Sequence, residues 1–317
     1  MKKIIYILCL TFGVSVFTSC ELDEQVDPNV LVPEGADTDF LLNGIETQFA
    51  NFFSGTSDFG AELTRMETLT GPTYEAAFTA TSFDAVWEDA YAEVLVDTDV
   101  LQTIALEIEQ FHHVGIAQVI EAYTLITLVD MFGDVPYTEA LDPINFVPYA
   151  DSGESIYNAA LTLLDQAIAN FALTPSSTPE EADIIYLGNV TKWTKAAKTL
   201  QVKIHLQRRL VEEGTSRSAI NALIADNDLI QQNEDAFVFT YGTNAQAPNS
   251  QHPDYNANYA GGANEYMANS YMDLLANDKS SADPRITYYF YRQDVDPTDD
   301  VTELDCINSA APPWYSP

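Results

Sequence analysis

Residues 116–141 read IAQVIEAYTLITLVDMFGDVPYTEAL, a long apolar run that ends in a glycine- and proline-containing turn. Before its glycine it is apolar almost all round, which is typical of a helix buried at the centre of a helical protein. Gly133 and Pro136 predict the end of that helix, because glycine permits the conformation that closes a helix and proline cannot continue one. In the turn, we expect Asp134 to accept amide protons and Tyr137 to fold back on the core. The motif therefore indicates architecture rather than chemistry.

Apolar residues recur at helical spacing on both sides of this stretch. Asn189 is a suitable N-cap for one of these helices, and Trp87 and Trp193 lie on helical stripes, where core packing is the expected role. Because the connections are short, we expect consecutive helices to pack as hairpins in a mostly α fold, although no clean tetratricopeptide repeat signature is present. The expected helices span residues 39–53, 83–111, 154–171, 189–212 and 218–226.

The composition changes in residues 227–263, which are rich in Asn, Gln, Tyr and Gly. Within them, FVFTY at 237–241 is the one short run that resembles a strand. Long irregular segments in compact proteins tend to be functional surfaces or disordered, so we expect the binding face here. One more helix is expected at about residues 264–276.

The N-terminus has the pattern of a lipoprotein signal peptide, expected at residues 1–19. Lys2 and Lys3 precede an apolar run that is too short to span a bilayer, and the small pair Thr18-Ser19 comes directly before Cys20. We expect cleavage before Cys20, lipid on its thiol, and a flexible acidic tether over residues 20–38. The alternative is an ordinary secreted protein cut near Ser19.

The formal net charge of −35 argues against several classes of ligand but identifies none. Binding to nucleic acid or to anionic lipid through charge is not expected from such a chain, and an uncharged or cationic ligand is favoured over a phosphorylated one. Adaptation to a saline habitat would explain the acidity equally well. Cys9 lies in the leader, Cys20 is expected to carry lipid and Cys306 has no partner left, so no internal disulfide is expected.

Signals of catalysis or of a metal site are weak in this sequence. No nucleophile elbow, zinc-protease motif, P-loop or dinucleotide-binding glycine pattern is present, so we expect neither an enzyme nor a cofactor. His112 and His113 are adjacent and cannot share one helix face as metal ligands, so we expect ordinary surface histidines. Residues 294–305 begin like a calcium loop but have Asp299 in place of the glycine, which leaves an irregular calcium site open. With so many acids, a carboxylate pair for glycoside hydrolysis is also left open.

Four features together resemble the SusD/RagB family of outer-membrane nutrient-binding lipoproteins. They are the leader, MFGDVPYTEAL at 131–141, TKWTKAAKTLQVKIHLQRRL at 191–210 and ADPRI at 282–286, in the same order and spacing. The resemblance implies tetratricopeptide-type helix pairs with an irregular, loop-rich ligand-binding face over residues 39–317. It also implies a non-enzymatic protein of the cell outer membrane that caps a SusC-like TonB-dependent transporter and binds an oligosaccharide or peptide. Family members are generally longer, so a C-terminally truncated chain is expected.

The basic residues of the 191–210 motif admit two interpretations. In the simpler interpretation, they form a solvated helix face and pair with acidic neighbours. In the more specific interpretation, they contact another molecule. These residues are Lys192, Lys195, Lys198, Lys203, Arg208 and Arg209.

We expect an uncharged glycan to be bound by aromatic rings, which stack on its sugar faces, and by amide side chains, which bind its hydroxyls. The alternative for any one of these residues is core packing or loop cover. A second function also stays open, that of a helical scaffold that binds a peptide or partner chain. The candidate ligand-binding residues are Tyr241, Asn256, Tyr259, Asn264, Tyr266 and Trp314.

Overall fold

The computed structural model describes residues 36–69, 73, 77–246, 250–255, 265–278, 280–281 and 283–285. The described residues from Asp37 onward belong to one compact unit. The expected signal peptide, Cys20 and most of the expected tether lie outside the described residues. The calcium-like run and four of the six candidate ligand-binding residues also lie outside them, namely Asn256, Tyr259, Asn264 and Trp314.

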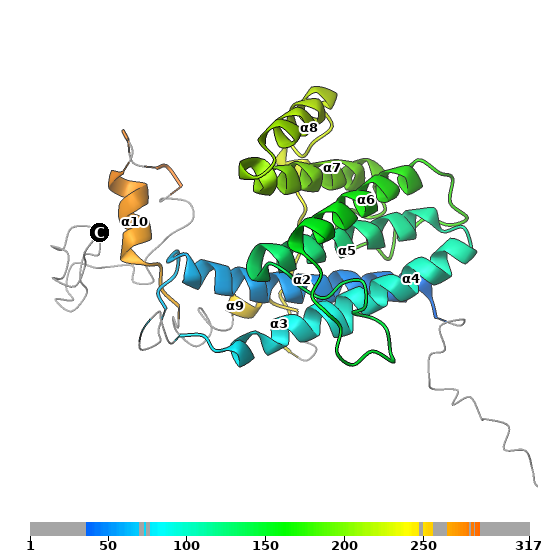
Figure 1. Cartoon of the computed structure of the whole chain (residues 1–317), viewed down its shortest axis with the longest axis horizontal. Helices are drawn as coiled ribbons and strands as arrows, with labels where there is room; N and C mark the ends of the chain where they lie inside the picture. Colours follow the sequence, from blue (N-terminus) through cyan, green and yellow to red (C-terminus); the bar gives the residue numbers. More distant parts are fainter. Residues whose placement is uncertain are drawn as a thin grey trace, which may run out of the picture. The chain divides into compact units, whose positions relative to one another are not determined.

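Helix α5 (Phe111–Phe132) is the core helix of this unit, as its continuous apolar sequence predicts. It packs against α4 (Val96–Glu107), α6 (Gly153–Phe171), α7 (Val190–Gln207) and α2 (Thr38–Leu63), which surround it in Figure 1. By length and composition α5 could cross a membrane, but 72% of its most apolar window is buried inside the protein. Its hydrophobicity is therefore explained by core packing.

Successive helices pack against one another along the chain, as the short connections predict. The expected helix over 83–111 begins as α3 (Asp84–Glu88), passes through the π-helical turn η4 (Asp89–Leu95) and continues as α4. The remaining helical elements are η3 (Ala80–Phe83), η5 (Arg208–Leu210), α8 (Glu213–Asp226), η6 (Asn233–Asp235), α9 (Pro253–Tyr255) and α10 (Asn269–Asn277).

The described residues contain no strand, so the prediction of a strand at 237–241 is wrong. They contain only isolated bridges, Glu67 with Met267 and Val135 with Asp151. Although 237–241 has the composition of a strand, no segment within the described ranges pairs with its backbone. Its first ring, that of Phe237, packs edge-on against Trp193 at 5.6 Å between centroids. Side-chain packing therefore replaces the hydrogen-bond ladder that a strand needs.

The turn after α5 confirms that the FGDVPYTEAL motif is architectural. Gly133 has φ of +80°, a conformation that favours glycine, and ends the helix. Asp134 accepts an amide proton as expected, but from Gly153 N at 2.8 Å, so it caps α6 rather than its own turn. Asp151 caps the turn instead, through Tyr137 N at 3.0 Å and Thr138 N at 2.8 Å. Tyr137 packs against the core as predicted.

His112 and His113 are both buried, which corrects the expectation of surface histidines. Nε2 of His113 lies 2.8 Å from Oδ1 of Asp39, and Nε2 of His112 lies 3.2 Å from the carbonyl oxygen of Leu173. Burial lowers the pKa of His112. The first turn of α5 is enclosed by α2 and by the end of α6, so residues on more than one of its faces are covered.

The tryptophans and the predicted cap behave as expected. Trp193 is fully buried, and Trp87 is half-buried against the core. Asn189 caps α7, since its Oδ1 accepts from Thr191 N at 3.1 Å and Lys192 N at 3.2 Å. These local signals place the helices that form the site described next.

Candidate functional site

A cleft of about 340 Å³ opens between α2 and residues 237–241 and 252–254. Helix α2 supplies one wall, and Tyr123 of α5 and Ile185 extend it inward. The other wall consists of Phe237, Phe239, Tyr241, His252 and Asp254. A volume near the lower end of the range for small-molecule sites suits one or two sugar rings. The lining residues are Glu46, Phe49, Ala50, Phe53, Ser54, Ser57, Asp58, Tyr123, Ile185, Phe237, Phe239, Tyr241, His252 and Asp254.

Six aromatic rings line the cleft, and they touch one another in two groups. Phe49 lies 5.2 Å from Tyr123 and 6.0 Å from Phe237 between centroids, and Phe53 lies 5.3 Å from Tyr123. On the outer side, Tyr241 lies 4.8 Å from Phe239 and 4.5 Å from the ring of His252. Tilted and edge-on contacts of this kind fix ring orientations at little entropic cost. The cleft therefore offers preformed aromatic surfaces.

Glu46 lines the inner end of the cleft and is fully buried. Its Oε2 accepts a hydrogen bond from Ile184 N at 2.7 Å, while its Oε1 accepts none from the part of the chain that the structure describes. Burial raises the pKa of Glu46 to about 10, and the nearby negative charge of Asp183 adds to the rise. The side chain is therefore a neutral carboxylic acid at pH 7, able both to donate and to accept.

Carboxylates gather at the mouth of the cleft. Partial burial raises the pKa of Asp58 to about 6, and the charges of Asp254, Glu265 and Glu62 add to the rise. His252 Nδ1 lies 3.5 Å from Asp254 Oδ2 and accepts a hydrogen bond from Asp254 N at 3.2 Å. The mouth is therefore strongly negative.

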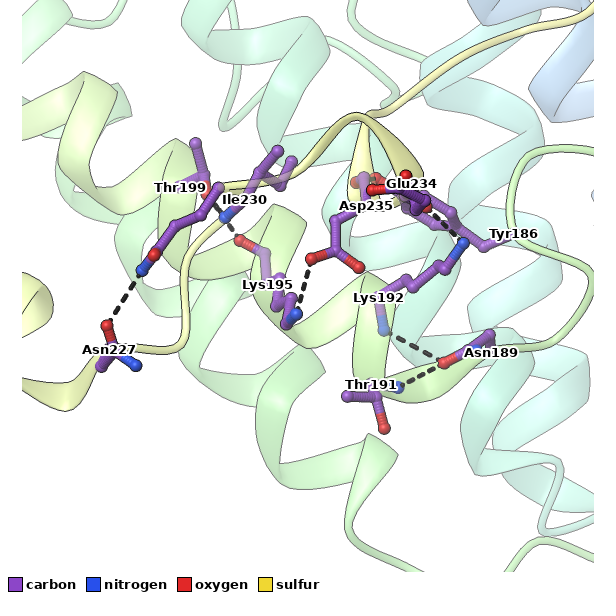
Figure 2. Close-up of polar contacts among 11 residues, drawn as sticks. Tyr186, Asn189, Thr191, Lys192, Lys195, Thr199, Asn227, Ile230, Glu234 and Asp235 are labelled. Carbon is purple, nitrogen blue, oxygen red and sulfur yellow. Dashed lines mark hydrogen bonds and ion pairs between the residues drawn. The ribbon is translucent and has the colours of Figure 1, made fainter.

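Helix α7 holds the segment that leads into the outer wall. Figure 2 shows Lys195 facing Asp235, with Nζ and Oδ2 2.6 Å apart, and Lys192 reaching the carbonyl oxygen of Glu234. One turn on, Ile230 N donates to Thr199 Oγ1 at 3.0 Å. We call residues 226–235 the strap. These bonds position the strap directly before Phe237.

Most basic residues of α7 are paired with acids, as the simpler interpretation predicts. Lys198 bridges Asp226 at 2.5 Å and Asp228 at 2.8 Å, and these hydrogen bonds raise the pKa of Lys198. Lys203 pairs with Asp130 of α5, and Arg208 pairs with Glu212. The face is less solvated than expected, because the strap covers part of it and Arg208 is buried.

Of the candidate ligand-binding residues, Tyr241 lines the cleft. Tyr266 does not line it; this residue is exposed, and its carbonyl oxygen accepts from Thr68 N at 2.7 Å. The sequence did not predict the wall formed by Phe49, Phe53 and Asp58. Apolar residues at helical spacing, such as those of α2, indicate core packing and give no sign of a binding site. Helix α2 also runs to Leu63, beyond the predicted end at residue 53. That extension brings Asp58 to the mouth.

A second hollow of about 370 Å³ lies beside the FGDVPYTEAL turn. It contains one aromatic side chain, Tyr137, together with Asp99, Glu121 and Asp142. Burial raises the pKa of Glu121, which accepts from Gln102 Nε2 at 2.7 Å. With a single ring it offers little surface for stacking, so the aromatic cleft is the better candidate. Within the described ranges, no group of three or more His, Cys, Asp and Glu side chains is placed to hold a metal ion.

Comparison with known proteins places the chain in a family. Residues 31–305 match the SusD-like family model described as "Starch-binding associating with outer membrane". A comparison with curated protein sequences finds no match.

Solved structures share the fold. A SusD/RagB family protein of Bacteroides thetaiotaomicron VPI-5482 has a TM-score of 0.57 at 20% identity, over 66% of this chain and 46% of its own. A SusD homologue of Bacteroides fragilis NCTC 9343 has a TM-score of 0.58 at 21% identity, over 79% and 52%. A chitin-binding SusD homologue of Flavobacterium johnsoniae has a TM-score of 0.53 at 19% identity, over 63% and 47%.

The chain thus spans about half the length of the solved structures that it matches. The mostly helical fold without strands in the described residues is that of these structures, and the family match covers most of the chain. The chain belongs to the SusD-like family of outer-membrane nutrient-binding proteins.

Proposed function

We propose that this protein captures an oligosaccharide in the aromatic cleft at the cell surface and delivers it to a SusC-like TonB-dependent transporter of the outer membrane. SusD-like proteins are binding proteins rather than enzymes. The observation that carries the proposal is the cleft itself, in which six rings surround a volume of about 340 Å³.

Sugar rings present C–H faces that stack on aromatic rings, and hydroxyls that need hydrogen-bond partners. The two ring groups supply the first requirement. Ser54 and Ser57 supply the second, since each hydroxyl can both donate and accept. The starch-binding description of the family and the chitin-binding homologue support a carbohydrate ligand.

A glycan array followed by titration calorimetry on the purified protein tests the proposal. We expect saturable binding to at least one glycan, and loss of that binding by tenfold or more in Tyr241→Ala and Phe53→Ala, because each removes a stacking surface. Tyr149→Ala is the matched control, because Tyr149 is exposed and lies outside the cleft. Absence of binding to any glycan, together with binding to peptides, would favour the alternative of a peptide-binding scaffold.

An exposed apolar loop supports a protein partner. Ile144, Phe146 and Val147 are 83%, 90% and 85% exposed, and such side chains close together mark interaction surfaces. We place the transporter contact here. Replacing all three with Ser should reduce co-purification of the transporter while leaving glycan affinity unchanged. Unchanged co-purification would remove this loop from the contact.

The membrane attachment in this proposal is the lipid on Cys20, followed by the acidic tether over residues 20–38. One acyl chain anchors a protein only marginally, whereas two or more hold it stably. The compact unit would then stand on the membrane without crossing it.

A further inference from the structure

Acidic side chains predominate around the cleft. Asp58 and Asp254 line its mouth, and no lysine or arginine is among the lining residues of the described chain. Glu62, Glu67 and Glu265 lie nearby, since burial and then neighbouring carboxylates raise the pKa values of Asp58, Glu62 and Glu67. His252 also lines the mouth, with Nδ1 3.5 Å from Asp254 Oδ2, and it partly offsets the effect of the carboxylates on the pKa of Asp58. No lysine or arginine of the described lining adds to this single imidazole, so acidic groups predominate at the mouth.

A neutral sugar in this cleft would leave that repulsion in place and would remove water from it. Partly desolvated like charges destabilise one another more strongly as water leaves, because the local dielectric constant falls. A ligand cation between Asp58 and Asp254 would reverse the sign of the interaction. The electrostatic arrangement therefore favours a positively charged group.

The aromatic walls favour the same group. The faces of aromatic rings carry negative charge density and attract ammonium groups within about 6 Å, by about 0.5–2 kcal/mol depending on desolvation. Tyr241 and Phe239 bring ring surfaces to the acidic mouth, and Phe53 does so from α2. At the inner end, the buried Glu46 is among the lining residues.

We propose that the glycan bound in this cleft carries free, protonated amino groups, as in an oligosaccharide of 2-amino-2-deoxy sugars. The ammonium lies between Asp58 and Asp254, and the sugar ring stacks on the aromatic walls. This proposal rests on the proposed function and adds the ligand class. It also predicts that uronic acids and sulfated sugars do not bind, because the carboxylates at the mouth of the cleft repel anions.

Three β-1,4-linked oligosaccharide series of equal length test the proposal, since they differ only at carbon 2. They carry a hydroxyl, an acetamido or an amino group there. By calorimetry on the purified protein at low ionic strength, we expect the amino series to bind at least tenfold more tightly than either neutral series. In Asp58→Asn and Asp254→Asn we expect that preference to fall to less than threefold. Glu107→Gln is the control for net charge, because Glu107 is exposed on α4 outside the cleft.

The outcomes separate the two proposals. Equal or tighter binding of a neutral series overturns the amino-sugar inference and leaves the proposed function standing. Binding of the amino series that is equally weakened in Glu107→Gln, or matched by a linear polyamine without sugar rings, reveals general attraction to an acidic protein and also overturns the inference. If no series binds and a broad glycan array is also empty, both proposals fail.

Discussion

Trp193 Nε1 donates a hydrogen bond to Asp183 Oδ2 at 2.6 Å, and both residues are fully buried. The same carboxylate accepts from Ile185 N at 2.9 Å, Tyr186 N at 2.9 Å and Gly188 N at 2.8 Å. One aspartate thus joins α7 to the loop before it. Because a buried charge is tolerated only when its hydrogen bonds are satisfied, this pair is central to stability.

Trp193→Phe should lower the free energy of unfolding by about 2–4 kcal/mol. The change removes a hydrogen bond to a buried charge, at about 1.5–3 kcal/mol, and leaves a small void. Urea unfolding followed by circular dichroism measures the difference. Trp87→Phe, at a half-buried ring stacked on Tyr91, is the control and should cost clearly less. Equal costs would show that the bond to Asp183 contributes little.

Glu46→Gln should change how stability depends on pH. The folded pKa of Glu46 is raised to about 10 from an ordinary value of 4.5, so the unfolded chain releases this proton first. The contribution of Glu46 is complete below about pH 4.5 and is lost progressively as the pH rises to about 10, at up to roughly 1.4 kcal/mol per pH unit.

Glutamine mimics the neutral acid at every pH, so this variant should match the parent near pH 5 and exceed its stability at pH 8–9. Unfolding in urea across that pH series makes the comparison. Glu93→Gln, at an exposed position of η4, controls for the loss of one charge. If the free energy of unfolding depends on pH in the same way in the parent and in Glu46→Gln, the pKa of Glu46 is not raised in the folded protein.

Gly115→Ala should destabilise the protein by about 1–3 kcal/mol, through overpacking between α5 and α6. A methyl group at Gly115 would lie 2.5 Å from Cε1 of Phe171, a ring that is itself buried. Gly44→Ala on α2 meets nothing within 4 Å and should instead stabilise its helix by about 0.5–1 kcal/mol. Thermal unfolding of the pair should therefore give shifts of opposite sign.

Lys195→Met should weaken ligand binding more than it weakens the fold. The ion pair with Asp235 holds the strap that carries Phe237 to the cleft, and partly exposed pairs contribute only about 0–1 kcal/mol to stability. We expect a several-fold loss of affinity by calorimetry. Lys203→Met, which breaks a pair with Asp130 away from the strap, should leave affinity unchanged. Equal affinities in the two variants would show that the strap does not position the wall.

Cys20→Ala should abolish metabolic labelling with a fatty acid and release the protein from the membrane fraction. The thiol is the expected site of acylation, and the acidic residues after it cannot hold the chain on a membrane by charge. Ser19→Thr, which keeps a small residue beside the cysteine, serves as the control. Persistent labelling of Cys20→Ala would place the lipid elsewhere.

Local sequence signals were enough for most of the helical fold. The apolar run of α5, the stop at Gly133 and the cap at Asn189 each depend on neighbours within a few positions, and the structure confirms all three. The strand prediction at 237–241 failed because strand formation requires a partner segment. The composition of the run cannot supply that partner.

Local sequence patterns were sufficient to place most of the helices and the end of α5, and the composition shows that the chain is strongly acidic. Only the tertiary structure decided that His112 and His113 are buried, because the covering groups come from α2 and the end of α6. It also decided the cleft, where Phe49 meets Phe237 and Glu46 meets Ile184, 138 positions away. Helical periodicity reports that a residue is apolar on one face, whereas long-range packing decides whether that face closes on the core or lines a site.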